Sequence, residues 1–373
     1  MDMLQSMVQE FVEFVRIDAE TGHEGAIADL AEARLAQLGL SVARDDAGSH
    51  FGGETGNLIG RLVGPRVDQA REPVLLCAHL DRVVPGRGVK PLVLEDRITS
   101  SGDTVLAADD VAGIVAILAG LRLALDTQEQ LPPVEVAFTV SEEVGLKGSR
   151  HMDYSLLKSR VGYVLDAAGP VGTVIIASPT HVVLNVAISG GAAHAAINPE
   201  DGVSAIQIAG EAIASIPFGR LDHRTTANIG SVHGGSATNI VCDRVDLSCE
   251  VRSLHHDRSL ALAEEYANTF RDAAERRGGS AHVDTLVHYH CYRVAPTSPV
   301  VARAERVFAA LGRTCTLGTT MGGSDANNFN QHGIESVCLG MGFEQVHSCR
   351  ETIPLDQLLC AAQMVRELIL AGE

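Results

Sequence analysis

The sequence has few basic residues for its length. Its 373 residues include 29 Lys and Arg against 47 Asp and Glu, which gives a formal net charge of −18 at pH 7. A nucleic-acid backbone would be repelled by this charge unless the few cations were gathered on one face. We therefore expect no nucleic-acid partner.

Long hydrophobic runs are also absent. The longest apolar stretch, Val111–Leu121, ends at Arg122, and it is shorter than the about 20 residues that a membrane-spanning helix needs. The N-terminal residues MDMLQSMVQEFVEF mix acidic and amide side chains into the apolar positions, unlike the basic start and apolar middle of an export signal. We expect no membrane span and a cytoplasmic protein.

Paired cysteines and common cofactor motifs are missing as well. The eight cysteines are scattered without a C-x-x-C pair, which argues against a zinc ribbon or a disulfide framework. Cys77 and Cys338 lie in apolar runs, where we expect buried thiols. The chain has no G-x-x-x-x-G-K-[ST], G-x-S-x-G or H-E-x-x-H motif, so the chemistries that depend on those motifs are disfavoured.

Apolar residues, in contrast, make up 46% of the chain. Short apolar runs bounded by turn residues predict strands at 57–64, 73–81, 134–140 and 161–167. Helical spacing predicts helices at 3–17, at 25–39 and from Asp110 to about Leu125. Strands that alternate with helices in this way predict an α/β fold, with a mainly parallel sheet flanked by helices.

The pattern changes near Ser178. The length predicts two domains, and residues 178–293 follow the order strand, helix, two strands, helix, strand, which is typical of a small split βαβ sandwich. After Arg293 a helix, a Gly-rich turn, an apolar strand and a final helix resume the first pattern. We therefore predict one domain from residues 1–177 and 294–373, interrupted by an inserted domain at 178–293.

Acidic and histidine side chains stand where the apolar runs stop. They are His79 and Asp81, Asp109 and Asp110, Glu142 and Glu143, Asp166, and His347. Because ligands in open α/β sheets bind just beyond the carboxyl ends of the strands, we expect these groups to converge. Neighbouring carboxylates repel one another, and divalent cations would relieve that repulsion. Mixed nitrogen and oxygen ligands favour two zinc ions, or manganese or cobalt, over calcium or magnesium.

A set of ordered motifs spans nearly the whole chain: AHLDRVVPG, AADDVAGI, SEEVGLKGS, LDA, GGAAHAAINPEDG, GGSATNIV with CEVRS, GGSDAN and GFEQVHSCRE. H-x-D or Glu-Glu alone is a weak signal, but the ordered set is specific. It resembles the co-catalytic dizinc exopeptidases and aminoacylases, most closely their peptidase T-like (tripeptide aminopeptidase) branch. The resemblance implies a zinc-exopeptidase fold whose inserted domain is a ferredoxin-like lid, with a homodimer formed through that lid.

The resemblance also implies metal ligands. Asp109 would bridge two ions, His79 and Asp166 would complete one site, and Glu143 and His347 would complete the other. Open coordination positions would remain for water, as in catalytic sites.

Three further residues would serve the chemistry. Asp81 would orient the imidazole of His79. Glu142 would act as general base, removing a proton from a water activated by the two ions and passing it to the leaving amine. His194 matches a lid histidine that helps to bind the oxyanion, within one subunit or across a dimer interface.

Substrate contacts are implied at Asn239 and Arg252, where the planar guanidinium suits a carboxylate. Gly323 and Ser324 would present backbone groups near the same place. The expected reaction is hydrolysis of an amide bond in a short peptide. Deacylation of an N-acyl amino acid, cleavage from the carboxyl end, and metal binding without catalysis stay open.

Simpler structural readings apply to some of these residues. Asp110 suits the first turn of a helix, where an acid is favoured. His288 and His290 resemble a metal pair, but we expect them to face solvent.

Overall fold

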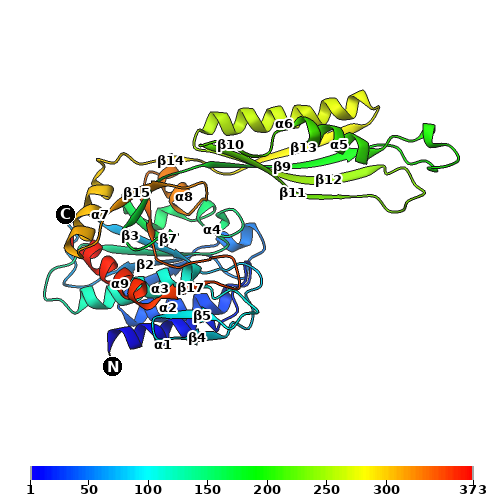
Figure 1. Ribbon diagram of the computed structural model, residues 1–373. Helices are drawn as coiled ribbons and strands as arrows, with labels where there is room; N and C mark the ends of the chain where they lie inside the picture. Colours follow the sequence, from blue (N-terminus) through cyan, green and yellow to red (C-terminus); the bar gives the residue numbers. More distant parts are fainter. Residues whose placement is uncertain (1, 372–373) are drawn as a thin grey trace. The chain divides into compact units, whose positions relative to one another are not determined.

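The computed structural model describes residues 2–371, and the chain forms two compact units (Figure 1). The first unit contains the chain up to Ala177, Tyr292–Thr320 and the chain from Ser324 onward, while the second contains Ser178–Cys291 and Met321–Gly323. Each unit has its own cluster of buried apolar side chains. No helix among residues 2–371 is long and apolar enough to span a membrane.

A mixed sheet forms the centre of the first unit. Its strands, within the described residues, run in the order β1-β2-β6-β3-β7-β16-β8-β14, with β15 beside β8. Their bounds are β1 Leu40–Arg44, β2 Leu58–Leu62, β3 Val74–His79, β6 Val134–Thr139, β7 Val161–Ala167, β8 Thr173–Ser178, β14 Tyr292–Arg293, β15 Thr316–Thr319 and β16 Glu335–Gly340. The four central strands β6, β3, β7 and β16 pair in parallel, whereas β1, β2 and β6 pair antiparallel. The parallel centre brings several strand carboxyl ends to one edge.

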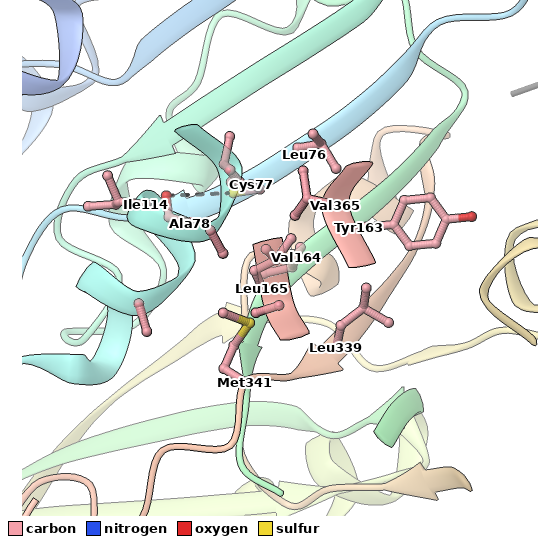
Figure 2. Close-up of a cluster of buried hydrophobic side chains, with 14 of the residues drawn as sticks. Leu76, Cys77, Ala78, Ile114, Tyr163, Val164, Leu165, Leu339, Met341 and Val365 are labelled. Carbon is pink, nitrogen blue, oxygen red and sulfur yellow. Dashed lines mark hydrogen bonds between the residues drawn. The ribbon is translucent and has the colours of Figure 1, made fainter. Parts of the chain in front are cut away.

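Helices cover this sheet. They are α1 Met3–Val15, α2 Gly25–Gln37, α3 Ala108–Leu125, α4 Lys147–Arg150, α7 Pro299–Ala310, α8 Ala326–Gln331 and α9 Leu355–Leu370. Helix α3 is buried on nearly all sides because it packs against β3, α1 and α9, and this explains its almost wholly apolar sequence. Figure 2 shows Leu76 of β3, Val164 of β7 and Leu339 of β16 in the buried cluster, together with Ile114 of α3 and Val365 of α9.

The second unit is a five-stranded antiparallel sheet with helices on one face (Figure 1). The strand order is β10-β11-β12-β9-β13. The elements are β9 Thr180–Ser189, α5 Ala205–Ser215, β10 Gly219–Asp222, β11 Thr225–Gly234, β12 Arg244–Ser253, α6 His256–Arg276 and β13 Ser280–Tyr289. Side chains alternate along β9 and β12 between the buried face and the opposite face, as expected for a sheet with one covered side.

The expectation for two histidines of this unit was wrong. His288 and His290 are only partly exposed. The ring of His288 lies 4.9 Å from that of His181, and the ring of His290 stacks on His256 at 4.5 Å. Ring packing at the end of β13 therefore shields both imidazoles from much of the solvent.

Several elements carried no clear sequence signal. A small sheet has the order β17-β5-β4, with β4 at Pro91–Val93, β5 at Arg97–Ser100 and β17 at Thr352–Pro354. These strands have three or four residues each, too few to show a hydrophobic period.

Candidate active site

The parallel strands deliver the predicted cluster to one edge of the first unit. His79 is the last residue of β3, Asp166 lies near the end of β7, and Glu143 follows β6. Strand β3 pairs with both β6 and β7, so these three residues come from adjacent strands. Asp109 at the start of α3 and His347 in the segment after β16 complete the set.

Five of these side chains form two groups that share Asp109. In the first, the Nε2 atom of His79 lies 3.0 Å from Oδ1 of Asp109 and 3.8 Å from Oδ1 of Asp166. In the second, the Nε2 atom of His347 lies 3.1 Å from Oε2 of Glu143 and 3.4 Å from Oδ2 of Asp109. The possible ligand atoms in each group lie within 4.8 Å of one another. This spacing allows each group to hold one metal ion.

Burial and mutual charge dominate the electrostatics of the cluster. Burial raises the pKa of Asp166 well above its usual value, and the charge of Asp109 adds to the effect. Burial would also raise the pKa of Asp109, but its hydrogen bonds with His347 and His79 lower it below the usual value. Hydrogen bonds to Asp109 and Glu143 raise the pKa of His347 to about 10. Each imidazole thus lies against two carboxylates.

The donor set fits divalent cations. The Oε1 atom of Glu143 is buried and has no hydrogen-bond partner, which is costly for a carboxylate oxygen unless a cation meets it. Two imidazoles with three carboxylates form a mixed nitrogen and oxygen set of the kind that suits zinc. A candidate site for two ions is therefore present in the first unit.

Glu142 lies beside this cluster without belonging to either group. It is only 8% exposed, and burial raises the pKa of its carboxyl well above the usual range. A carboxyl with a raised pKa, next to a candidate metal site, is suited to accepting and returning a proton.

Asp81 makes contacts that its sequence position alone does not reveal. The Nδ1 atom of His79 lies 2.9 Å from the Asp81 backbone carbonyl and 3.5 Å from its carboxylate. The carboxylate accepts hydrogen bonds from the backbone N–H of Glu142, at 2.9 Å, and from the hydroxyl of Thr21, at 2.7 Å. Asp81 therefore contacts both a candidate ligand and the turn that carries Glu142.

Three buried carboxylates near the cluster were missed by the sequence reasoning. Glu24 accepts the backbone N–H and the hydroxyl of Ser141. Asp325 accepts the hydroxyls of Thr139 and Ser149, and Glu351 accepts three backbone N–H groups near Asp109. No sequence motif identifies these carboxylates, because each accepts hydrogen bonds from a segment far away in the sequence.

Asp110 has two backbone partners. Its carboxylate accepts the N–H of Gly113 at 3.1 Å, as a first-turn acid does, and the N–H of His79 at 3.2 Å. Besides stabilising the start of α3, it thus holds the end of β3.

The remaining predicted residues are divided between the units. His194 and Asn239 are exposed in the second unit. The backbone of His194 forms an isolated antiparallel β-bridge with that of Ile240, and the Ala195 N–H donates to the Asn239 carbonyl. Arg252 also belongs to the second unit, as does Gly323. Ser324 belongs to the first, and its N–H donates to Oδ1 of Asn327.

Arg252 is held by its neighbours within the second unit. Its Nη2 atom lies 3.0 Å from Oε2 of Glu250, which lies 2.9 Å from Nε2 of His181. Its Nη1 atom donates to the Tyr289 hydroxyl at 3.2 Å and to the Met321 carbonyl at 3.3 Å. These contacts fix the direction of the guanidinium.

The chain is similar to known proteins along its whole length. Residues 177–278 match the M20 family model described as a peptidase dimerisation domain. Uncharacterized protein YqjE of Bacillus subtilis (strain 168) is 39% identical over 363 residues, with 97% of each chain covered. The structure of aminopeptidase PepT from Bacillus cereus ATCC 10987 has 38% identity, covers 99% of both chains and gives a TM-score of 0.89. A tripeptidase structure from Staphylococcus aureus has 36% identity, covers 98% of this chain and 97% of its own, and gives a TM-score of 0.92.

Proposed function

The chain belongs to the PepT-like tripeptidase branch of the M20 peptidase family, and on this premise we propose that it hydrolyses short peptides at a two-metal site. The observation that carries the proposal is the pair of candidate ligand groups joined by Asp109, with the buried carboxyl of Glu142 beside them. We assign the preferred substrate as an unmodified tripeptide, cleaved next to its N-terminal residue.

The two ions would be held by the five clustered side chains. His79 and Asp166 would bind one ion, Glu143 and His347 the other, and Asp109 both. The ligand set favours zinc, with manganese or cobalt as substitutes. When bound, such ions polarise the scissile carbonyl and lower the pKa of water.

Glu142 would move the proton. Its carboxylate would remove a proton from the attacking water and deliver it to the amine that leaves, and its raised pKa favours the first of these steps, the uptake of the proton. Asp81 would keep Glu142 in place by accepting its backbone N–H. The two adjacent glutamates thus have different functions, since Glu143 binds metal.

The second unit would recognise the peptide. Arg252 would attract the C-terminal carboxylate of the substrate by its positive charge, and Glu250, Tyr289 and the Met321 carbonyl hold the guanidinium in place. Asn239 would hold the peptide backbone, and His194 would stabilise the oxyanion. We further propose that this unit forms a homodimer, consistent with its match to a dimerisation domain.

A substrate panel and metal analysis test the proposal. The purified chain would be stripped with a chelator, restored with zinc, manganese or cobalt, and assayed on a tripeptide, its N-acetylated form, a dipeptide and an N-acyl amino acid. We expect metal-dependent release of the first residue of the free tripeptide. Rapid deacylation beside an inert tripeptide would instead identify an acylase.

A further inference from the structure

Glu351 is a buried glutamate that the proposed chemistry does not use. Its side chain, in a residue only 1% exposed, accepts three backbone hydrogen bonds. The Oε2 atom accepts the N–H groups of Leu106 and Ala107 at 2.8 and 2.9 Å, and the Oε1 atom accepts the N–H of Asp109 at 2.9 Å. One carboxylate therefore binds the whole turn that leads into α3.

This turn depends on an acceptor from elsewhere in the chain. Ala107 directly precedes α3 and offers no side-chain hydrogen bond, and the backbone that follows is not helical at Asp109 and Asp110. Ala107 also has a φ of 64°, in the left-handed region that a residue other than glycine adopts only when its surroundings hold it there. Glu351 supplies acceptors for three N–H groups of this non-helical turn, while the Asp110 carboxylate caps the helix that follows by accepting the Gly113 N–H.

The other side of Glu351 is joined to His347. The two residues lie in one short segment in which the Glu351 N–H donates to the Ser348 carbonyl at 3.1 Å. The Glu351 carbonyl accepts the hydroxyl of Thr99 at 3.3 Å, and the following residue begins β17, which pairs with β5. Glu351 therefore joins the segment of His347 to the turn of Asp109.

We propose that Glu351 is a positioning residue for the metal ion held by Asp109, Glu143 and His347. The inference rests on the two-metal site of the proposed function. Two of these ligands, Asp109 and His347, lie on the two segments that Glu351 joins. The hydrogen bonds of Glu351 hold these segments at the spacing that a shared metal ion requires. The Nε2 atom of His347 lies 3.4 Å from Oδ2 of Asp109, so a shift of the turn changes the ligand spacing directly. The other ion, bound without His347, depends less on Glu351.

The test is zinc binding by E351Q. A carboxamide has one acceptor oxygen, and its NH2 group would face a backbone N–H. At least one of the three hydrogen bonds that Glu351 accepts is therefore lost. Zinc per chain would be measured across a series of buffered free-zinc concentrations. We expect one of the two ions to bind about 10–100-fold more weakly than in the wild type, as is usual when the support of a ligand is removed. H347N, which removes a ligand of the same ion, should also weaken the binding of that ion.

A matched control separates positioning from general destabilisation. Glu135 is also 1% exposed in the first unit, and it accepts the backbone N–H groups of Lys158 and Ser159, both at 2.9 Å, besides pairing with Arg61. E135Q should lower the thermal midpoint of the metal-free protein and leave both zinc affinities unchanged. E351D, which keeps a shortened carboxylate, replaces E351Q if the latter does not fold, and should weaken the same ion.

The outcomes are distinct. Two zinc ions bound to E351Q with wild-type affinity would overturn the positioning role while leaving the proposed function intact. Equal loss of zinc in E135Q and E351Q would also overturn it, because the effect would then be one of overall stability. If the wild type itself binds no zinc, manganese or cobalt, the proposed function fails together with the inference.

Discussion

At the scale of single residues, the two neighbouring glutamates after β6 differ in what surrounds them. Glu143 contacts His347 at 3.1 Å, whereas Glu142 belongs to neither ligand group. Burial raises the pKa of both carboxyls, but a cation would reverse the effect for a direct ligand. Only Glu142 is then left with a proton affinity suited to acid–base chemistry.

Glu142→Gln tests this division. The amide keeps the size of the side chain but accepts no proton, so kcat should fall by about 10²–10⁴-fold, the usual contribution of general acid–base catalysis. Steady-state rates on a tripeptide, combined with elemental analysis, measure the effect. Two ions per chain should remain, since no ligand changes. Turnover close to that of the wild type would remove Glu142 from the role of base.

Glu250 makes the stability of the second unit depend on pH in the acid range. The close contact with His181, at 2.9 Å between Nε2 and Oε2, together with the charge of Arg252, lowers the pKa of Glu250 from 4.5 to about 2 in the folded protein, although burial opposes the shift. The unfolded chain therefore takes up a proton near pH 4.5 while the folded chain does not. The stabilisation is fully present above pH 4.5 and is lost as the pH falls towards 2. Its size is about 1 kcal/mol, because solvent screens a side chain that is 34% exposed.

Urea unfolding at pH 5 and pH 3 measures this contribution. Glu250→Gln should lower the midpoint at pH 5 and have a smaller effect at pH 3. The exposed Glu264, which pairs with Arg271 on the same helix, provides the control substitution Glu264→Gln. A difference between wild type and Glu250→Gln that is the same at both pH values would contradict the assignment.

The candidate metal ligands were easier to predict from the sequence than the buried carboxylates that hold the surrounding segments in place. Asp166 and His79 end apolar strands, so the rule that ligands gather at strand carboxyl ends places them together. Glu351 and Asp325 follow no such rule. Their partners are backbone N–H groups and hydroxyls from distant segments, and those contacts exist only after the chain has folded.

At the scale of elements, the contact between α3 and α9 depends on a glycine. A Cβ atom on Gly120 would lie 2.4 Å from Cγ1 of Val365 and 2.9 Å from the carbonyl oxygen of Ala362. Neither neighbour can move freely, because one is a branched side chain in the core and the other is backbone. The close approach of the two helices thus requires the missing side chain.

Gly120→Ala should therefore destabilise the first unit by about 1–3 kcal/mol, although alanine is the better helix former by about 1 kcal/mol. Thermal unfolding should show a lower midpoint, and adding Val365→Ala should restore part of the loss. A Cβ atom on Gly210 in α5 would have no atom within 4 Å, so Gly210→Ala is the matched control. It should leave the midpoint unchanged or raise it; equal destabilisation by both substitutions would refute the packing argument.

The elements that the sequence predicted best are the buried ones. The strand β3, VLLCAH, is buried at every position, so its apolar run is continuous, as in parallel sheets covered on both faces. Strand β1 at the sheet edge is mostly exposed, and its residues LSVAR show no comparable signal. Edge strands are determined by pairing with a neighbour, which periodicity along one segment does not reveal.

At the scale of the whole molecule, the chain leaves the first unit at the end of one strand and returns to it at the neighbouring strand. Strands β8 and β14 are adjacent in the sheet, and the Val294 N–H donates to the Ile176 carbonyl at 2.8 Å. Neighbouring strands lie about 4.8 Å apart, so a short linker between Ala177 and Tyr292 can replace residues 178–291. The first unit keeps its own apolar cluster and all five candidate metal ligands in such a deletion.

The deleted chain should fold and bind two ions but hydrolyse no tripeptide, because it lacks His194, Asn239 and Arg252, to which the proposed function assigns the oxyanion and the substrate. Circular dichroism, zinc per chain and release of the first residue measure the three properties separately. The point variant Arg252→Ala in the full chain serves as the control, and it should raise KM for a free tripeptide more than for its C-terminal amide, since only the free peptide carries the carboxylate. Peptidase activity in the deleted chain would show that the first unit alone recognises the substrate, and an unchanged preference for the free carboxylate in Arg252→Ala would assign that contact elsewhere.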